Sequence, residues 1–425
     1  MILFLPYDVL SSVTRQLELA EELRGRGHEV RFAGAGPFLD LIADAGFEAE
    51  PLANLRAERL LTHLRAMREN LAGLGKAAAG LWRELDLGGY LDAELALFAR
   101  LSPSLVVSEE RPTAQLSARI RRVPHVSLRN SYRTPYSTTA MLDVGGSLLR
   151  RLHRDPTVVQ AKITRWIGAP FFARLRSIAR SRGLETRLDY DDYLNGDDLS
   201  LLCDVPEFAP TRSLPENHVV IGPLYWDPLW PDPEWLEELP ADRSTVYVSL
   251  GSSGTSALFH AIADGLRADG APVAIATGRQ IARDQLPSGD GVWTAELVRA
   301  TRVLERVGLC ICHGGNGTVY QALSRGVPLV CIPTHLEQRW NARRVAELGL
   351  GIHLDWAALR RDPAVLRRAV ATIRQTPEYA QRAAEWQKRI AEWKAPRLAA
   401  DAIERLLRSR KSPPSRGEGV APAAP

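Results

Sequence analysis

The stretch "CHGGNGTVYQALSRGVP", residues 312–328, decides the fold because it joins a strand pattern to a helix pattern through a glycine-rich turn. The apolar run "VGLCIC" at 307–312 is typical of a buried strand, and "GTVYQALSRG" at 317–326 is typical of a helix. Glycines in such a turn let the backbone approach a ligand, and the free N–H groups of a helix N-terminus suit a phosphate. A tight turn without any ligand is the alternative interpretation.

Strand and helix patterns alternate on both sides of this turn. At the start of the chain, "MILFLP" (1–6), "SVTRQLELAEELRGRG" (12–27) and "EVRFAG" (29–34) predict a strand, a helix capped by Ser11 or Ser12, and a second strand. A proline-rich segment at 206–240 predicts a linker, and the alternation restarts at "STVYVSLGSS" (244–253). The sequence therefore predicts two α/β halves with parallel sheets, whose ligands bind at the carboxyl ends of the strands, in a cleft between the halves.

The composition is ordinary for a globular protein of this size. The chain has 425 residues, 45% of them hydrophobic, and a formal net charge of +4. The N-terminal residues resemble a first strand and not a signal peptide, and no run is apolar enough for a membrane-spanning helix. The four cysteines do not form the paired spacing of a zinc site. We therefore expect a reduced, cytoplasmic protein.

One segment carries an unusual charge. Residues 111–187 contain 16 Lys and Arg against 3 acids, a local excess of 16 − 3 = 13 positive charges. A solvated helical face is the favoured interpretation, and a surface for an anionic acceptor or an anionic membrane is the alternative. The segment shows no nucleic-acid-binding motif, so we expect no nucleic-acid partner.

The longer stretch 313–351, "HGGNGTVYQALSRGVPLVCIPTHLEQRWNARRVAELGLG", closely resembles the donor-binding signature of family 1 glycosyltransferases, which include UDP-glycosyltransferases and bacterial macrolide glycosyltransferases. The stretches "RQLELAEELRGRGHEVRFAG" (15–34), "HVVIGP" (218–223) and "VYVSLGSS" (246–253) also fit. The resemblance implies the GT-B fold. It implies an acceptor-binding Rossmann-like domain at 1–205, the linker at 206–240, a nucleotide-sugar-binding Rossmann-like domain at 241–385, and a helix at 386–408 that returns to the first domain. Residues 409–425 lack apolar periodicity and are expected to be disordered.

The resemblance also implies which residues bind the donor. By this resemblance, the donor's diphosphate is bound by Ser252, His313, Gly315, Asn316, Gly317 and Thr318. Gln321 stands where the family often has a glutamate that binds the ribose hydroxyls, and Glu337 and Gln338 match the pair that contacts the donor sugar. No metal and no separate cofactor are expected, because helix dipole, histidine and hydroxyls neutralise the leaving diphosphate. "DYDD" at 189–192 matches a short metal motif of another glycosyltransferase class, but such matches are common by chance.

Two positions depart from the family pattern. The aromatic residue that stacks on the base is replaced by Leu297, although Val298 can still offer backbone hydrogen bonds to the base edge, so uridine and thymidine diphosphates both stay open. The catalytic histidine is replaced by Ser12, whose hydroxyl cannot act as a base near pH 7 and whose alternative role is helix capping. The substitute base is Asp8, which we favour, or Glu109 or Glu110 at a strand end. The further alternatives are an acceptor that needs little deprotonation and a non-catalytic protein.

These observations lead to one prediction of function. The chain is expected to be an inverting, metal-independent glycosyltransferase that moves a sugar from a UDP- or dTDP-sugar to a small-molecule acceptor, in natural-product biosynthesis. The alternative is a non-catalytic auxiliary protein that partners another transferase. The acceptor, the sugar and the oligomeric state are not encoded in any motif of this sequence.

Overall fold

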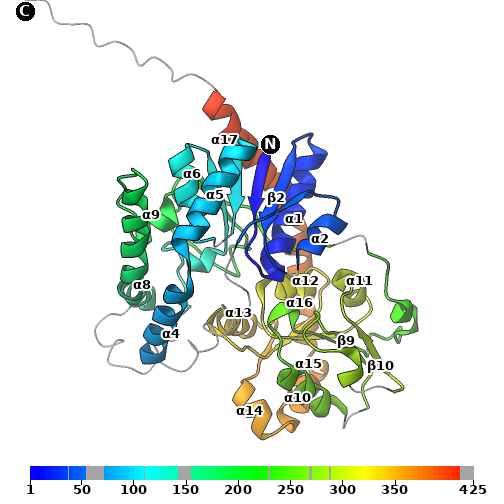
Figure 1. Ribbon diagram of the computed structural model, residues 1–425. Coiled ribbons are helices and arrows are strands. Elements are labelled where there is room, and N and C mark those ends of the chain that lie inside the picture. The colour runs from blue at the N-terminus through cyan, green and yellow to red at the C-terminus, as the bar shows by residue number, and fades with distance from the viewer. Residues whose placement is uncertain are drawn as a thin grey trace, which may run out of the picture.

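The structure, a computed structural model, describes residues 1–36, 38–53, 71–109, 111–141, 155–227, 230–267, 270–286 and 289–411. These residues form two domains, each built on one parallel sheet with helices packed against it (Figure 1). The first sheet has seven strands in the order β3-β2-β1-β4-β5-β6-β7, and the second has six in the order β10-β9-β8-β11-β12-β13. The predicted α/β class with two parallel sheets is confirmed.

The N-terminal domain contains the first sheet and its helices. Its strands are β1 (Ile2–Leu5), β2 (Val30–Gly34), β3 (Ala49–Pro51), β4 (Leu105–Ser108), β5 (His125–Arg129), β6 (Leu199–Leu202) and β7 (His218–Val220). Its helices are α1 (Leu10–Gly25), α2 (Leu39–Asp44), α4 (Leu71–Glu84), α5 (Leu87–Leu101), α6 (Ala114–Arg121), α8 (Pro156–Ser181), α9 (Tyr190–Asn195) and the short η1 (Ser131–Arg133). In the centre, Phe4 pairs with Phe32 on one side and Val107 on the other, and all three are buried. Such strands are apolar along their whole length because both faces of the sheet are covered.

The C-terminal domain contains the second sheet. Its strands are β8 (Val246–Ser249), β9 (Val273–Ala276), β10 (Val292–Ala295), β11 (Leu309–Cys312), β12 (Leu329–Cys331) and β13 (Gly351–His353). Its helices are α10 (Ser256–Arg267), α11 (Ala300–Leu304), α12 (Asn316–Leu323), α13 (Leu336–Glu347), α14 (Trp356–Arg361), α15 (Ala364–Gln375) and α16 (Pro377–Glu392), with η2 (Glu234–Glu238), η3 (Gly251–Ser253) and η4 (Arg283–Gln285). The glycine-rich turn connects β11, which lies at the centre of this sheet between β8 and β12, to α12.

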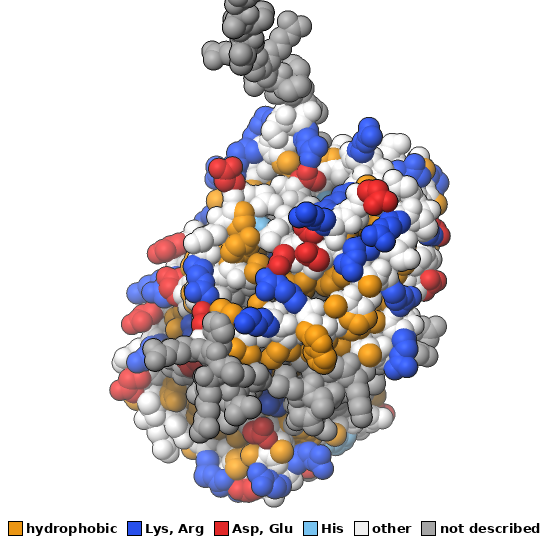
Figure 2. All heavy atoms as spheres, turned by 90° about the vertical axis from the view of Figure 1, so that its left-hand side faces the viewer, with side chains coloured by type: hydrophobic (Ala, Val, Ile, Leu, Met, Phe, Trp, Pro, Cys, Tyr) orange, Lys and Arg blue, Asp and Glu red, His pale blue; other side chains and the backbone are white. Residues whose placement is uncertain are grey.

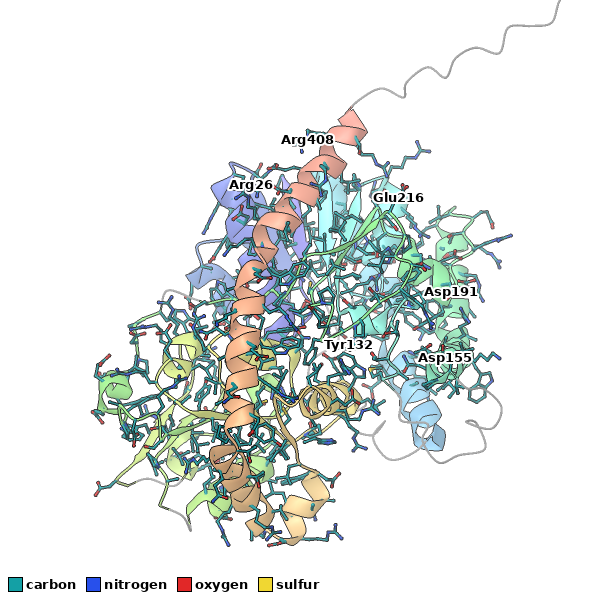
Figure 3. The ribbon with its side chains drawn as sticks, turned by 180° about the vertical axis from the view of Figure 1, so that it is seen from behind. Arg26, Tyr132, Asp155, Asp191, Glu216 and Arg408 are labelled. Carbon is teal, nitrogen blue, oxygen red and sulfur yellow. The ribbon has the colours of Figure 1, made fainter. Side chains whose placement is uncertain are left out.

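The last two helices run from the second domain back to the first, as Figure 3 shows from behind. α16 packs on α12, and α17 (Ala395–Lys411) packs on α1. Arg26, at the end of α1, contacts Asp401 of α17 at 2.6 Å between Nη1 and Oδ1. The chain therefore ties the two domains together twice, once through the segment before β8 and once through α17.

Three expectations about local structure need correction. The segment 206–240, expected to be a linker, contributes β7 to the first sheet, because its prolines flank the run "HVV" without interrupting it. Ser12 does not cap α1: the helix begins at Leu10 after Val9, and the Ser12 hydroxyl accepts hydrogen bonds from the Tyr7 N–H at 3.1 Å and the Gln16 amide at 3.3 Å. Of the expected disordered tail, residues 409–411 belong to α17 and the rest lies outside the described residues.

The basic segment forms much of the face that carries α8 and α9 (Figure 2). Basic side chains are interspersed there with apolar and acidic ones. Several are paired within the protein: Arg165 binds Asp191, Arg182 binds Asp92, and Arg174 donates to the Leu85 carbonyl. This pairing agrees with the interpretation of a solvated helical face. Among the described residues, no helix combines the length and the apolar character needed to cross a bilayer.

An aromatic stack joins the domains beside the cleft. Tyr132, in η1 of the N-terminal domain, stacks on Trp340, in α13 of the C-terminal domain, with ring centroids 4.0 Å apart. Both side chains are fully buried. Such a pair adds a geometric preference to the burial of a large apolar area, so it fixes how the two domains meet.

We expect Trp340→Ala to destabilise the protein by about 3–5 kcal/mol, because it removes a buried indole and leaves a cavity between the domains. The measurement is the urea dependence of unfolding, followed by circular dichroism. The control is Trp166→Ala on α8, where the side chain is 76% exposed and the expected change is below about 0.5 kcal/mol. Equal effects of the two substitutions would contradict this assignment of the interface.

Candidate active site

A cavity of about 600 Å³ lies between the two domains. The C-terminal domain contributes His313, Gly315, Asn316, Gly317, Thr318, Gln321, Glu337 and Gln338 to its lining, and the N-terminal domain contributes Ser12 and Glu109. Ten of the residues predicted from the sequence are thus brought together, although they come from segments that are up to 326 positions apart (338 − 12). The cleft expected at the carboxyl ends of the strands is where these residues meet.

The glycine-rich turn has a shape that other residues cannot adopt. Gly314 has a φ of +82°, and a Cβ there would lie 2.7 Å from the backbone oxygen of Gln338. The carbonyl of Gly314 accepts a hydrogen bond from Asn341 at 2.8 Å, which fixes the turn against α13. At Gly317 a Cβ would meet no protein atom within 4 Å, so the missing side chain leaves space on the cavity side of α12. The N-terminus of α12 is therefore open to a ligand.

His313 stands at the start of this turn with a side chain that is almost completely buried. Burial lowers its pKa below the ordinary value, because the charged form is less well solvated there. The imidazole is therefore neutral near pH 7 and donates one N–H. It packs against Gly251 of η3, where a Cβ would come within 3.0 Å of its Cε1 atom. A neutral donor next to a helix N-terminus suits an anionic oxygen.

Glu337 and Gln338, at the start of α13, have different surroundings. The carboxylate of Glu337 accepts a hydrogen bond from the Tyr132 hydroxyl at 2.8 Å and lies 3.8 Å from the Arg133 guanidinium, both in the N-terminal domain. The amide of Gln338 accepts from the backbone N–H of Thr334 at 2.8 Å and donates to the Ser253 hydroxyl at 2.7 Å. Gln338 therefore fixes the loops that border the cavity, whereas Glu337 sits at the seam between the domains.

The three candidates at the catalytic position are placed differently. Ser12 lines the cavity, but its hydroxyl holds the loop that precedes α1. Asp8 is buried against Gly36, where a Cβ would overlap its carboxylate, and it does not contribute to the cavity lining. Glu109 follows β4, lines the cavity and is 7% exposed. Glu110 lies outside the described residues. Position in the cleft therefore favours Glu109 over Asp8.

The remaining predicted donor residues are less directly placed. Val298 packs on the core of the C-terminal domain and does not line the cavity. The side chain of Ser252, within η3, lies outside the described part of the chain. Leu297, which replaces the expected aromatic residue, packs against the core of the N-terminal domain, to which Trp226 also belongs. Trp226 and Tyr225 do line the cavity, so aromatic rings reach it from the segment between the domains.

The N-terminal side of the cavity is mainly apolar and aromatic. α4 supplies Leu81 and Trp82, and a second group of rings comes from α8 and α9. These rings belong to Phe171, Phe172, Tyr190 and Tyr193. Clustered rings of this kind bind flat or hydrophobic molecules and leave the polar groups of a ligand to be satisfied elsewhere.

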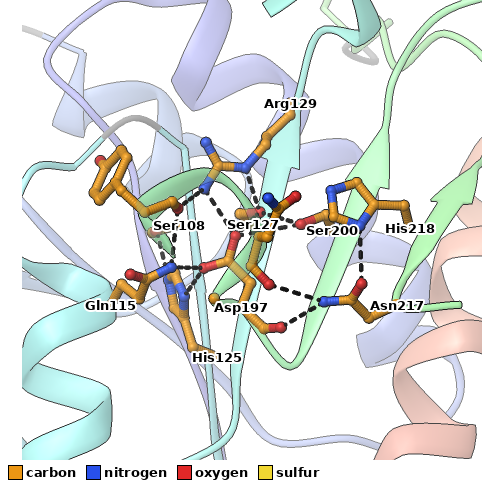
Figure 4. Close-up of polar contacts among 12 residues, drawn as sticks. Ser108, Gln115, His125, Ser127, Arg129, Asp197, Ser200, Asn217 and His218 are labelled. Atoms are coloured by element: carbon orange, nitrogen blue, oxygen red, sulfur yellow. Dashed lines mark hydrogen bonds and ion pairs between the residues drawn. The ribbon is translucent and has the colours of Figure 1, made fainter. Parts of the chain in front are cut away.

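A buried polar network supports one cationic side chain in this wall (Figure 4). Arg129 lines the cavity and donates to Asp197 at 2.8 Å and to Ser127 at 2.9 Å. Burial would raise the pKa of Asp197, but Arg129 and His125 outweigh it and hold the pKa well below its usual range. The Nδ1 atom of His125 lies 2.7 Å from the Asp197 carboxylate, and its Nε2 atom lies 2.8 Å from the Ser108 hydroxyl. This Ser-His-Asp arrangement resembles a hydrolase triad. Neither Ser108 nor His125 lines the cavity, so the network serves to position Arg129.

The acidic segment 189–192 has a structural explanation. Asp189 caps α9, accepting from the Asp192 N–H at 2.9 Å, and the Asp192 carboxylate accepts from the Asp189 N–H at 3.4 Å. Asp191 forms an ion pair with Arg165. Among the described residues, no cluster of three or more His, Cys, Asp or Glu side chains has the arrangement of a metal site.

One residue of the cavity was missed by the sequence analysis. Arg15, on α1, lines the cavity and is only 3% exposed. Its guanidinium contacts Glu109 in its own domain and Asn316 in the other domain. The available signal was its place three residues after Ser12, on the same face of the helix.

Comparisons with known proteins agree with this arrangement. Residues 269–406 match the family "Erythromycin biosynthesis protein CIII-like, C-terminal domain". A PGL/p-HBAD biosynthesis glycosyltransferase from Mycobacterium tuberculosis is 27% identical over 348 residues, 81% of this chain and 78% of that protein. A PGL/p-HBAD biosynthesis rhamnosyltransferase from Mycobacterium bovis is 28% identical over 366 residues, 83% of this chain and 76% of that protein.

Solved structures of glycosyltransferases share the fold of nearly the whole chain. The calicheamicin glycosyltransferase CalG4 superposes with a TM-score of 0.70 and 25% identity, covering 97% of this chain and 99% of that one. The glycosyltransferase VinC, solved in complex with DTDP, shares the fold, with a TM-score of 0.69 and 20% identity over 96% of this chain and 99% of that one. The chain is therefore a glycosyltransferase of the GT-B fold, and its residues 269–406 are similar to the C-terminal domain of erythromycin biosynthesis protein CIII-like proteins.

Proposed function

We propose that this glycosyltransferase moves a sugar from a nucleoside diphosphate sugar to an apolar small molecule, with inversion at the sugar's C1 atom and without a metal ion. The observation that carries the proposal is the two-sided cavity. One side is a glycine turn with a helix N-terminus and a buried neutral histidine, and the other is a wall of aromatic rings. A donor and an acceptor with these complementary properties can therefore meet between the domains.

The donor's diphosphate is assigned to the N-terminus of α12. Its partners there are backbone N–H groups, the Thr318 hydroxyl and the imidazole of His313, with Gly315, Asn316 and Gly317 shaping the turn. We assign Gln321, one turn further along α12, to the ribose, and Glu337 to the sugar, because both line the cavity. The diphosphate gains negative charge as the bond to C1 breaks, and oriented N–H dipoles stabilise that charge most in the transition state. VinC, which shares the fold, was solved with a thymidine diphosphate, and both UDP- and dTDP-sugars stay candidates here.

The acceptor's proton is assigned to Glu109. An inverting displacement forms the bond from the acceptor oxygen to C1 while the diphosphate leaves from the opposite face, so one base near the acceptor is sufficient. Glu109 lines the cavity at the end of β4, between the aromatic wall and the glycine turn, whereas Asp8 faces Gly36. The relatives that match over 348 and 366 residues are named as a glycosyltransferase and a rhamnosyltransferase, which supports catalysis over the non-catalytic alternative.

The acceptor is assigned to the aromatic wall. Trp82, Phe171 and Tyr190 come from three different helices and enclose one side of the cavity. Related proteins are named for PGL/p-HBAD biosynthesis, and the solved structures that share the fold include a calicheamicin glycosyltransferase and a spinosyn rhamnosyltransferase. An acceptor with an aromatic or polyketide body fits the same kind of wall.

A transfer assay in excess EDTA tests the proposal as a whole. With UDP- and dTDP-sugars and phenolic or polyketide acceptors, we expect turnover that chelation does not reduce, because N–H groups and His313 take the place of a cation. The anomeric proton coupling of the product, measured by NMR, should show the configuration opposite to that of the donor. Loss of activity in EDTA with recovery in Mg²⁺ or Mn²⁺ would refute the metal-free site, and retention of configuration would refute the single displacement.

We expect His313→Ala to weaken the binding of the nucleoside diphosphate by about 10- to 150-fold, because a hydrogen bond to a charged group contributes about 1.5–3 kcal/mol. Isothermal titration calorimetry with UDP and dTDP measures this directly. The control is His353→Ala in β13, which is half-buried and does not line the cavity. An unchanged affinity in His313→Ala would remove the histidine from the phosphate site.

We expect Glu109→Gln to lower kcat by about 10²-fold or more, because a positioned base contributes about 10²–10⁴-fold. Asp8→Asn should have a much smaller effect, since Asp8 does not line the cavity. Steady-state kinetics over pH 5–9 should also show that the acidic limb of the kcat profile disappears in Glu109→Gln. A full wild-type kcat in Glu109→Gln combined with a strong loss in Asp8→Asn would reverse the assignment.

A further inference from the structure

Arg15 is a buried cation at the point where the two halves of the cavity meet. It lies on the first helix of the N-terminal domain and faces the C-terminal domain. Its side chain is 3% exposed and lines the cavity. A buried guanidinium is costly unless its partners compensate the lost solvation, so each of its contacts is informative.

The contacts of Arg15 join the proposed base to the proposed phosphate site. Its Nη1 atom donates to the Oε1 atom of Glu109 at 2.8 Å. Its Nη2 atom donates to the Oδ1 atom of Asn316, the first residue of α12, at 2.5 Å. The Nδ2 atom of Asn316 donates in turn to Asp204 at 2.9 Å, which fixes the amide with its oxygen toward Arg15.

The third nitrogen of this guanidinium has no hydrogen-bond partner among the residues that the structure describes. The Nε atom of Arg15 is buried and makes no hydrogen bond within the described residues. Buried donors are rarely left without a partner, because the loss of hydration is then not compensated. A buried cation that lines the cavity and contacts the first residue of α12 favours an anion at that helix N-terminus.

The geometry points to Arg15 as a second, cationic partner of the donor's diphosphate, which at the same time holds the Glu109 carboxylate toward the acceptor. This inference rests on the proposed function, which assigns the diphosphate to α12 and the base to Glu109, and adds to it a positioning residue from the opposite domain. The diphosphate is the ligand class that the site recognises. Arg15 is thus the side chain through which donor binding and base placement are connected.

The role of Arg15 follows from where charge moves during transfer. The acceptor's proton goes to Glu109, which loses its negative charge, while the broken bond between C1 and the phosphate oxygen leaves one more negative charge on the diphosphate. The new bond joins the acceptor oxygen to C1, so atoms and charges balance. Arg15 lies between the two sites, and its attraction shifts from Glu109 to the diphosphate as the reaction proceeds. A fixed cation that serves both charges needs no reorganisation during the step.

The other groups near Arg15 do not carry this role. Burial disfavours its charge, but the Glu109 carboxylate, first among the acidic groups around it, outweighs that effect and raises its pKa, so Arg15 stays protonated throughout the working range. Burial raises the pKa of Cys203 to about 12 and also raises that of Tyr132, so both are neutral near pH 7. Burial also raises the pKa of Asp204, whose carboxylate accepts from Ser131, Asn316 and Tyr320. Glu109 is the carboxylate in direct contact with Arg15.

The test compares Arg15→Gln and Arg15→Lys with wild type in two measurements. For binding, titration calorimetry with UDP and dTDP should show at least about tenfold weaker affinity in Arg15→Gln and partial recovery in Arg15→Lys, while uridine and thymidine bind as in wild type. For catalysis, the acidic limb of the kcat profile should move upward by roughly one to three pH units in Arg15→Gln, because a carboxylate that loses an adjacent cation is protonated more easily.

The control is Arg24→Gln on the same helix, where the guanidinium binds the carbonyls of Ala45 and Gly46 far from the cavity lining. It should leave both measurements unchanged. If Arg15→Gln does not fold, the comparison is made with Arg15→Lys, in which a single ammonium group replaces the planar guanidinium and should still lower diphosphate affinity. A folded variant with wild-type diphosphate affinity overturns the role of Arg15 while the proposed function stands. A wild-type protein that binds no nucleoside diphosphate overturns both.

Discussion

The structure depends on a series of buried polar contacts that runs from one domain to the other. Asp204, at the end of the N-terminal sheet, holds the amide of Asn316, and that amide meets the guanidinium of Arg15, which binds Glu109. Burying any of these polar groups alone would cost free energy, and the contact with the next group in the series offsets that cost. Because Asn316 is the first residue of α12, these contacts set the position of the helix N-terminus relative to the opposite domain. The aromatic stack of Tyr132 on Trp340 fixes the same interface with apolar area.

Two kinds of site are combined in the cleft without interfering with each other. The proposed donor side uses backbone geometry: a left-handed Gly314, an open Gly317 and the dipole of α12. The acceptor side uses side-chain surface, mostly rings from α8 and α9. Backbone N–H groups bind a diphosphate in the same way whichever molecule accepts the sugar. The side chains that line an acceptor pocket, in contrast, can change with little effect on the sheets. The division explains why the strongest family signature, residues 313–351, lies in the C-terminal half of the chain.

Other polar arrangements resemble catalytic sites but have structural roles. The Ser108, His125 and Asp197 series is buried away from the cavity and fixes Arg129, and the acidic segment 189–192 caps α9. Both contain the residue types that catalysis uses, so composition alone does not separate them from a functional site. Access to a cavity separates them, because a catalytic group has to reach its substrate.

The sequence by itself determined the parts of this protein that depend on neighbours along the chain. Apolar runs bounded by glycine or proline placed the strands, and the turn at 313–317 with its following helix identified the donor side. Local patterns suffice there because a strand end and a helix start are adjacent in sequence. Even so, the short run "HVV" within a proline-rich segment was read as linker although it completes the first sheet as β7.

Only the tertiary structure decided which polar residues face the cleft. Asp8 and Glu109 were both plausible from their positions after strands, yet Asp8 turns toward Gly36 and Glu109 toward the cavity. Arg15 belongs to no local sequence motif, because its partners Glu109 and Asn316 are 94 and 301 positions away. The direction of a side chain after a strand, and its partner in another domain, depend on how distant elements pack. No local pattern in the sequence contains that information.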